Sequence, residues 1–170
     1  MRVVVCDTGP LLHLSEAQAL DVLSLTGEVH IPKAVDAEMA QRDATWQTQK
    51  PKWVQVNVLA LPHAPQAAAW QQTGFLDVGE AEAIALARQL TADWLLTDDA
   101  AARVFAQLLG VEVHGSLGIV LWAAAVGHLQ RGDAEATLDR LEQSSLWISA
   151  AVLEEAKAAL DKLFTQRSLE

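Results

Sequence analysis

Residues 3–10 read VVVCDTGP, and this stretch decides the fold. A run of β-branched residues that ends in the turn-forming letters DTGP predicts a short, fully buried strand followed directly by a turn. A helix is expected next, from about Leu11 to Leu25, and then a second short strand from Glu28 to Ile31. Buried strands separated by helices require crossover connections, so this beginning predicts a parallel sheet with helices on both faces.

The same alternation continues along the chain. Pro32 stands where helices often begin and opens a helix to about Arg42, while Lys50 to Val58 ends in an alternating stretch that suits a strand. The remaining expected helices are Gln66–Gln72, Gly79–Leu90, Ala100–Leu109, Leu117–Gln130, Asp133–Glu142 and Ala150–Leu163, and the remaining strands are Asp93–Thr97 and Val111–His114. We therefore expect a three-layer α/β/α sandwich around a central parallel sheet of four to five strands. The 170 residues suit one domain, with residues 129–170 as a C-terminal helical extension packed on it.

Composition narrows the class of protein. Hydrophobic residues make up 51% of the chain, which argues against a disordered protein. The longest uncharged stretch, Val113 to Gln130, is interrupted by glycines, so we interpret it as a buried helix with its entry loop rather than a membrane span. Cys6 is the only cysteine and the N-terminus lacks a leader pattern. A cytoplasmic protein without disulfides is therefore expected.

The net charge of −10 limits the possible ligands. A chain this acidic should repel a nucleic-acid backbone rather than attract it. Divalent cations held in an acidic pocket would reverse the sign of the charge locally. A protein partner with a basic segment is the other explanation that we consider.

Acidic residues stand at positions that a parallel sheet would bring together. Asp7 ends the first expected strand, and Asp98 and Asp99 end a later one. Ligands of open parallel sheets bind beyond the carboxyl ends of the strands, so both sites should lie along one edge. Glu80 lies in the first turn of the helix that leads to the later strand, and Glu38 lies one to two turns into an earlier helix.

Each of these residues also has a purely structural explanation. Asp7 could be a turn former, and one of Asp98 and Asp99 could be a helix N-cap. Glu80 could simply complement the helix dipole, and Glu38 could be a solvated surface residue. The combination is harder to explain in this way, because basic residues are sparse nearby.

Clustered carboxylates would need neutralisation. Two of them about 4 Å apart repel by roughly 4 kcal/mol at an effective dielectric near 20. Oxygen ligands without a histidine pair or a second cysteine favour magnesium or manganese over zinc. Such an ion bridges phosphate, activates water and stabilises the leaving oxygen, which predicts phosphodiester hydrolysis. The histidines, which we interpret as structural or surface residues, are His13, His30, His63, His114 and His128.

Four segments resemble a known family in their order and spacing: VVVCDTGPLLHL, IPKAVDAEMAQ, LDVGEAEAIALA and LLTDDAAARVFAQLLGVEVHGSLGIVL. They resemble the PIN-domain family, and within it the VapC-like toxins of prokaryotic toxin–antitoxin modules. The resemblance covers about Val3 to Gly127 and implies a PIN-like fold. Its catalytic residues would be Asp7, Glu38, Glu80 and Asp99. Its ligands for Mg2+ or Mn2+ would be Asp7, Glu80, Asp98 and Asp99.

Two neighbouring residues are weaker candidates under the same resemblance. Glu82 could substitute for Glu80 but is rotated to another face of the helix. Ser116 could add a hydroxyl to the pocket, although a loop-capping role is the alternative.

The resemblance also implies a function and partners. It implies a metal-dependent endoribonuclease that acts on RNA and is inhibited by a small antitoxin protein, often through an arginine inserted among the carboxylates. Homodimers are frequent in the family, and the apolar C-terminal helices could form such an interface or simply close the core.

Candidate RNA contacts are few. Lys50 and Lys52, beside Trp46 and Trp53, could bind phosphate and stack a base, with burial of both tryptophans as the alternative. Arg103 could orient a carboxylate or a phosphate, or form a surface salt bridge.

Three other functions are compared with this interpretation. A phosphatase that uses Asp7 as nucleophile needs a second aspartate two residues later, where Gly9 stands. A receiver domain needs a lysine after a later strand, and none is well placed. A catalytically inactive PIN-like protein-interaction module is the alternative from another class, and the retention of all four acidic positions argues against it.

Overall fold

A computed structural model describes residues 1–169. Within them, five parallel strands form one sheet in the order β3-β2-β1-β4-β5. The strands are β1 (Val3–Cys6), β2 (Glu28–Pro32), β3 (Val54–Asn57), β4 (Trp94–Leu96) and β5 (Val113–His114). The expected parallel sheet is therefore confirmed, at five strands.

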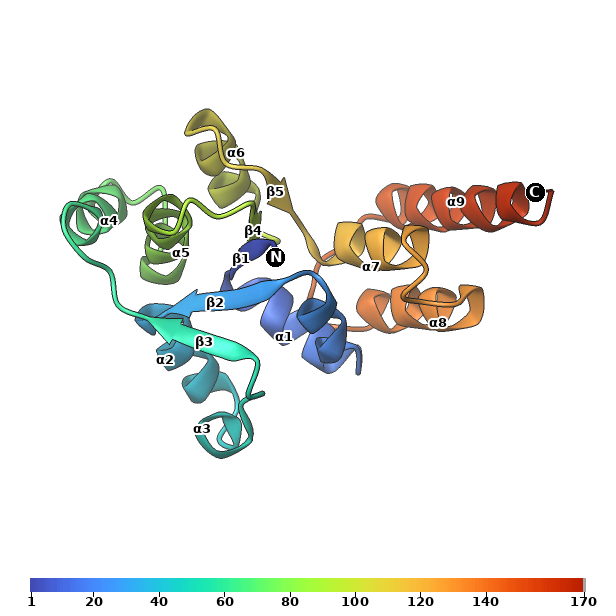
Figure 1. Ribbon diagram of the computed structural model, residues 1–170, viewed down its shortest axis with the longest axis horizontal. Coiled ribbons are helices and arrows are strands. Elements are labelled where there is room, and N and C mark those ends of the chain that lie inside the picture. Colours follow the sequence, from blue (N-terminus) through green and yellow to red (C-terminus); the bar gives the residue numbers. More distant parts are fainter. Residues whose placement is uncertain (170) are drawn as a thin grey trace.

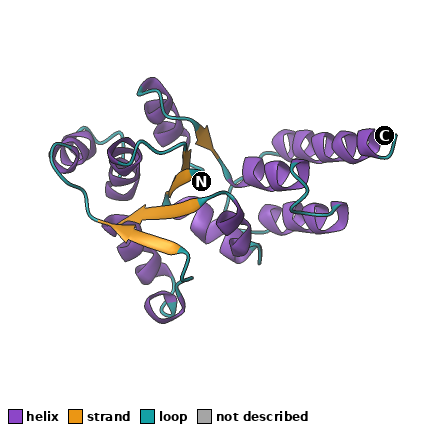
Figure 2. Cartoon of the chain, in the orientation of Figure 1, coloured by secondary structure: helices purple, strands orange, loops and turns teal. Residues whose placement is uncertain are grey.

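The sheet is covered on both faces, because its side chains alternate between two apolar cores. Val4 and Cys6 of β1 point into one core, while Val5 between them points into the other. The first core is closed mainly by α1 (Thr8–Glu16), α2 (Lys33–Arg42) and α7 (Ser116–Ala125). The second is closed by α4 (His63–Gln72), α5 (Val78–Gln89) and α6 (Ala100–Leu108). Figures 1 and 2 show the resulting three layers.

The strand order reverses direction between β1 and β4. The chain runs outward from β1 through β2 to β3, and then returns to place β4 on the other side of β1. Cys6 is paired with Leu96, so the residues that follow these two strands leave the sheet side by side. Such a switch point is where open parallel sheets form a crevice for ligands.

The C-terminal helices lie together beyond one end of the sheet. The helices α8 (Arg131–Glu142) and α9 (Ala150–Arg167) pack against each other and against α7, as Figure 1 shows. The Arg140 guanidinium donates a hydrogen bond of 2.6 Å to the carbonyl of Ala17 and so ties α8 to the end of α1. No helix within residues 1–169 is long and apolar enough to cross a membrane.

The helix expected from Leu11 to Leu25 is wrong as a single element. The helix α1 ends at Glu16, and a separate 3-10 helix, η1 (Leu20–Leu25), follows. Gln18 has a φ of 55°, and the Ala19 N–H donates 2.8 Å to the Leu14 carbonyl. This is a left-handed helix ending formed without glycine, so the usual sequence signal for a helix end is missing.

Two further differences concern the end of α7 and an additional short helix. The helix expected from Leu117 to Gln130 ends at Ala125, because Gly127 adopts a left-handed φ of 87° and the His128 N–H caps the Ala123 carbonyl. The short helix α3 (Trp46–Gln49) was not expected at all.

Candidate active site

A cleft of about 340 Å³ lies over the carboxyl ends of β1 and β4. Every acidic residue expected at a site lines this acidic cleft, and one further acid joins them. The acidic residues that line it are Asp7, Glu38, Asp77, Glu80, Asp98 and Asp99. The structure thus brings the expected side chains together, while their catalytic roles stay predictions.

Asp7 caps a helix and is also a buried carboxylate with a raised pKa. It is 6% exposed, and its Oδ1 accepts the Thr8 N–H at 2.8 Å as the N-cap of α1. Its Oδ2 accepts the Thr97 hydroxyl at 2.9 Å. Burial, with a smaller contribution from the charges of Glu80 and Asp77, raises the pKa of Asp7 to about 7, although these two hydrogen bonds lower it. The turn-former interpretation therefore describes part of its role only.

Glu80 is fixed by the beginning of α5. Its N–H donates to Asp77 Oδ1 at 2.8 Å, and the Asp77 N–H donates back to Glu80 Oε2 at 2.9 Å, which forms a capping box. The pKa of Glu80 is raised to about 7, mainly by burial and in addition by the charges of Asp77, Asp99 and Glu38. The hydrogen bond from the Asp77 N–H opposes this rise in part. One of its oxygens, Oε1, is left to the cleft.

Glu38 is half-buried, so the surface-residue interpretation does not describe it. The Thr8 hydroxyl donates a hydrogen bond to Glu38 Oε2. On the other side, its carboxylate lies against Gly79, where an added Cβ would come within 2.5 Å of Oε1. The absence of a side chain at position 79 therefore lets the carboxylate of α2 lie between the starts of α1 and α5.

The two neighbouring aspartates differ in how fully they are engaged. Asp98 accepts the Ser116 N–H at 2.7 Å and the Ser116 hydroxyl at 2.6 Å, and it pairs with Nδ1 of His13 at 2.7 Å. Asp99 caps α6 by accepting the Ala102 N–H at 2.8 Å through Oδ1 alone. Asp98 thus ties α6 to α1 and α7, whereas Asp99 keeps one oxygen for the cleft. Ser116 donates both of its hydrogen bonds to Asp98 and does not line the acidic cleft.

The cleft suits a hard divalent cation in donor type and in charge, although it is not a finished coordination shell. Within residues 1–169, no three acidic, histidine or cysteine side chains lie close enough together to hold a metal ion as they stand. Burial and the neighbouring carboxylates nevertheless raise the pKa values of Asp7 and Glu80, so keeping both groups ionised requires positive charge to balance them. A cation would supply that balance and would draw the carboxylates inward.

Sequence reasoning missed several side chains of the cleft. The spacing of Asp77 and Glu80 is that of a capping box and could have been found. His13 also lines the cleft, and so does Trp147 from the segment that joins α8 to α9. No local pattern places Trp147 there, because tertiary packing alone brings that segment to the sheet edge.

Two of the residues considered for RNA contact, Trp46 and Lys50, are engaged within the protein. Trp46 is 3% exposed, and its Nε1 donates 2.8 Å to Asp36, which also accepts the Lys50 ammonium at 2.8 Å. Burial of this tryptophan, the alternative interpretation, is what the structure has. Arg103 forms no ion pair within residues 1–169, and its Nη2 donates a long 3.4 Å hydrogen bond to the Thr97 carbonyl.

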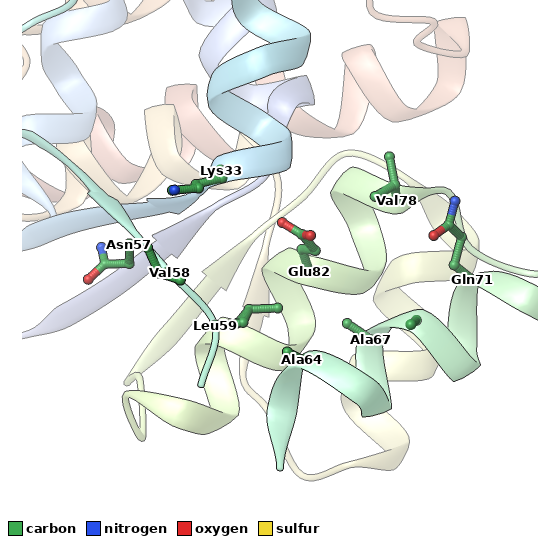
Figure 3. Close-up of a pocket in the computed structure, with 10 residues that line it drawn as sticks. Lys33, Asn57, Val58, Leu59, Ala64, Ala67, Gln71, Val78 and Glu82 are labelled. Carbon is green, nitrogen blue, oxygen red and sulfur yellow. The ribbon is translucent and has the colours of Figure 1, made fainter. Parts of the chain in front are cut away.

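A second, separate pocket contains Glu82. It has a volume of about 220 Å³ and lies between the end of β3 and the helices α4 and α5, as Figure 3 shows. Glu82 Oε2 accepts the Ala34 N–H at 3.1 Å, at the beginning of α2. Glu82 is the only acidic residue in that pocket lining. Glu80, by contrast, lines the acidic cleft.

An oxygen-rich acidic cleft at the switch point of a parallel sheet is an arrangement that suits cation-dependent phosphodiester hydrolysis. Comparison with known families identifies the chain further. A family model described as PIN domain matches residues 3–162, and the chain belongs to this family, whose members are in general metal-dependent nucleases. No curated protein and no solved structure gave a significant match.

Proposed function

We propose that this PIN-domain protein is an endoribonuclease that hydrolyses RNA phosphodiester bonds with Mg2+ or Mn2+. One observation carries the proposal: Asp7, Glu38, Glu80 and Asp99 line one cleft at the switch point of the sheet. Bound there, the cation supplies a Lewis acid and a water of lowered pKa.

The unused hydrogen-bond acceptor positions of the carboxylates suggest which of them bind the cation. Each carboxylate offers about four acceptor positions. Asp98 uses three of them within the protein, whereas Asp99 and Glu80 use one each and Asp7 uses two. We assign the cation to Asp7, Glu80 and Asp99, and we assign to Asp98 the positioning of the cleft wall.

Glu38 has a different role in this proposal. Its Oε2 is held by the Thr8 hydroxyl, while Oε1 accepts no hydrogen bond within residues 1–169. Oε1 can therefore orient the attacking water and accept its proton.

The test compares two glutamates of one helix. Glu80→Gln and Asp99→Asn should each lower manganese-dependent cleavage of RNA by about a hundredfold or more, because each removes charge where the cation binds. Glu82→Gln removes the same charge from α5 but in the separate pocket, so it should cut as the parent does. Parent-like cleavage by both cleft variants would refute the catalytic assignment.

We further propose that the protein is a VapC-like toxin that a small antitoxin inhibits. The net charge of −10 and the unbalanced carboxylates of the cleft suit a partner that inserts an arginine. The test is to mix the chain with the product of a short reading frame beside its gene. Inhibition of cleavage that depends on a basic residue of that product supports the proposal, and unchanged cleavage contradicts it.

Three smaller proposals accompany this function. We propose a homodimer, to be tested by light scattering, because Val126 and Val152 leave apolar surface exposed on the C-terminal part. We propose that residues 129–170 are an extension of the one domain, so that the chain should unfold in one cooperative transition. We propose a cytoplasmic location, because the single cysteine is buried and unpaired.

A catalytically inactive interaction module is the second candidate. The observation that favours it is the lack, in the described part of the chain, of a ready-made cluster of three metal ligands. This candidate predicts neither RNA cleavage nor a change of melting temperature with manganese, and either effect rejects it.

A further inference from the structure

Trp147 presents a bare aromatic face beside the acidic cleft. Its side chain is 86% exposed, whereas the other five tryptophans are buried or partly buried. It lines the acidic cleft, and it also lines a neighbouring pocket of about 370 Å³. Because this exposed indole lines two pockets, it can contact a ligand that enters either of them.

The segment that carries Trp147 is held in place. Leu146 and Ile148, on either side of it, pack against the apolar core. The N–H and the hydroxyl of Ser145 donate to the Glu16 carboxylate at 2.8 and 2.5 Å. Two inward side chains thus fix the indole between them in an outward position, and ligand contact would require little further ordering.

The neighbouring pocket, which we name the flanking pocket, joins an apolar wall to a free cation. Val113, Leu117 and Val152 contribute to its wall, and Arg103 lines it without an ion pair within residues 1–169. The flanking pocket shares Asp98, Leu146 and Trp147 with the acidic cleft, so the two pockets lie next to each other. An exposed indole and a guanidinium that line the same pocket match the two parts of a nucleotide, its base and its phosphate.

We propose that the flanking pocket is a nucleotide subsite, in which an unpaired base stacks on Trp147 and the adjacent phosphate pairs with Arg103. The inference rests on the proposed nuclease function and deepens it, since it specifies a single-stranded substrate. Bases in a duplex stack on one another and offer no free face to the indole. Stacking also gives affinity without positive charge, which suits a chain of net charge −10.

The test measures the affinity for a single-stranded 2′-O-methyl oligonucleotide, which resists hydrolysis, by fluorescence anisotropy. Trp147→Ala should weaken binding by about tenfold, the scale of one stacked base, while Trp147→Phe should keep most of the affinity. Leu108→Ala is the matched control, because Leu108 is 81% exposed on α6 and lines neither pocket. Cleavage of the corresponding RNA by Trp147→Ala should show a raised KM with kcat nearly unchanged.

Two further measurements separate the two halves of the subsite. Binding should quench the tryptophan fluorescence of the parent but not of Trp147→Phe. Arg103→Gln should weaken binding and lower the slope of its salt dependence by about one phosphate contact.

The outcomes distinguish this inference from the proposed function. If the parent binds and cuts RNA and Trp147→Ala does both equally well, the subsite is refuted and the nuclease stands. If Trp147→Ala weakens binding but neither the parent nor any variant cuts RNA, the subsite stands and the nuclease is refuted. Equal weakening of a duplex of the same sequence overturns the single-strand inference. A change of oligomeric state with unchanged oligonucleotide affinity makes Trp147 a protein contact and overturns it too.

Discussion

Two aspartates in this molecule have pKa values that are shifted in opposite directions. Asp36 of α2 accepts hydrogen bonds from the Lys50 ammonium and the Trp46 indole; burial raises its pKa, but these partners outweigh the burial and leave it below its ordinary value. Asp7 also accepts two hydrogen bonds, yet its deeper burial, together with the charges of Glu80 and Asp77, raises its pKa to about 7. The fold can therefore neutralise a carboxylate with lysine, and in the cleft it does not. Charge left unbalanced in this way is a mark of a functional site.

The largest expected contrast between the two regions is in catalysis. Asp7→Asn should abolish manganese-dependent RNA cleavage, a loss of about a hundredfold or more, because it removes a proposed cation ligand. Asp36→Asn removes an equal charge from the lysine-balanced site and should leave the rate within about twofold of the parent, as surface changes away from a site do. A gel assay of both variants measures this, and equal rates would remove the distinction between the regions.

A smaller effect should come from moving a cleft acid without removing it. In Gly79→Ala the new methyl group would lie 2.5 Å from the present position of Glu38 Oε1, so this carboxylate must shift. Cleavage should fall by about tenfold, as for a misplaced catalytic group, while the melting temperature stays near that of the parent. Combining it with Glu38→Gln should add little, since both changes act on one carboxylate. Additive losses would show that Gly79 acts elsewhere.

The pH dependence of stability should separate the two aspartates. The pKa of Asp7 rises from 3.8 to about 7 on folding, so the native state holds the extra proton between these values and loses stability as pH rises through 7. Asp7→Asn should therefore raise the free energy of unfolding near pH 8 by up to about 4 kcal/mol and change it little near pH 4. Asp36, with its lowered pKa, contributes stability above its unfolded pKa that is lost as pH falls through the folded value. Urea unfolding at both pH values tests the difference, and a destabilised Asp7→Asn protein at pH 8 would contradict it.

A further expected effect is stabilisation by the cation itself. Magnesium or manganese at about one hundred times its dissociation constant should add about 2.7 kcal/mol, and less at lower saturation, because it binds the native cleft only. Asp36→Asn should keep the rise in melting temperature, whereas Asp7→Asn and Glu80→Gln should lose it. Calcium-free buffer with added magnesium, followed by a chelator, checks that the shift is reversible.

The sequence was sufficient for the sheet and for part of the cleft. Apolar runs before Asp7 and Asp98 predicted two parallel strands, and parallel strands end at the same edge, so their convergence followed from simple geometry. Glu38 and Glu80 needed the family resemblance, because nothing in their own helices distinguishes them from ordinary surface or dipole-compensating acids. The break in the first helix was missed because Gln18 takes a backbone conformation that usually indicates glycine.

The remaining features depend on contacts between distant parts of the chain. The hydrogen bonds that engage Asp98 come from α1 and from the start of α7, which no local pattern connects. Trp147 reaches the cleft only because Leu146 and Ile148 pack into the core beside it. Such placements follow from tertiary packing and so cannot be read from periodicity.

The capping box of α5 has a consequence for heat inactivation. Glu80 both closes the first turn of α5 and presents its other oxygen to the cleft, so winding of that turn and placement of the carboxylate are one event. Helix ends fray well before a domain melts. Warming should therefore stop the proposed RNA cleavage reversibly while the far-ultraviolet circular dichroism of the protein still reports an intact fold.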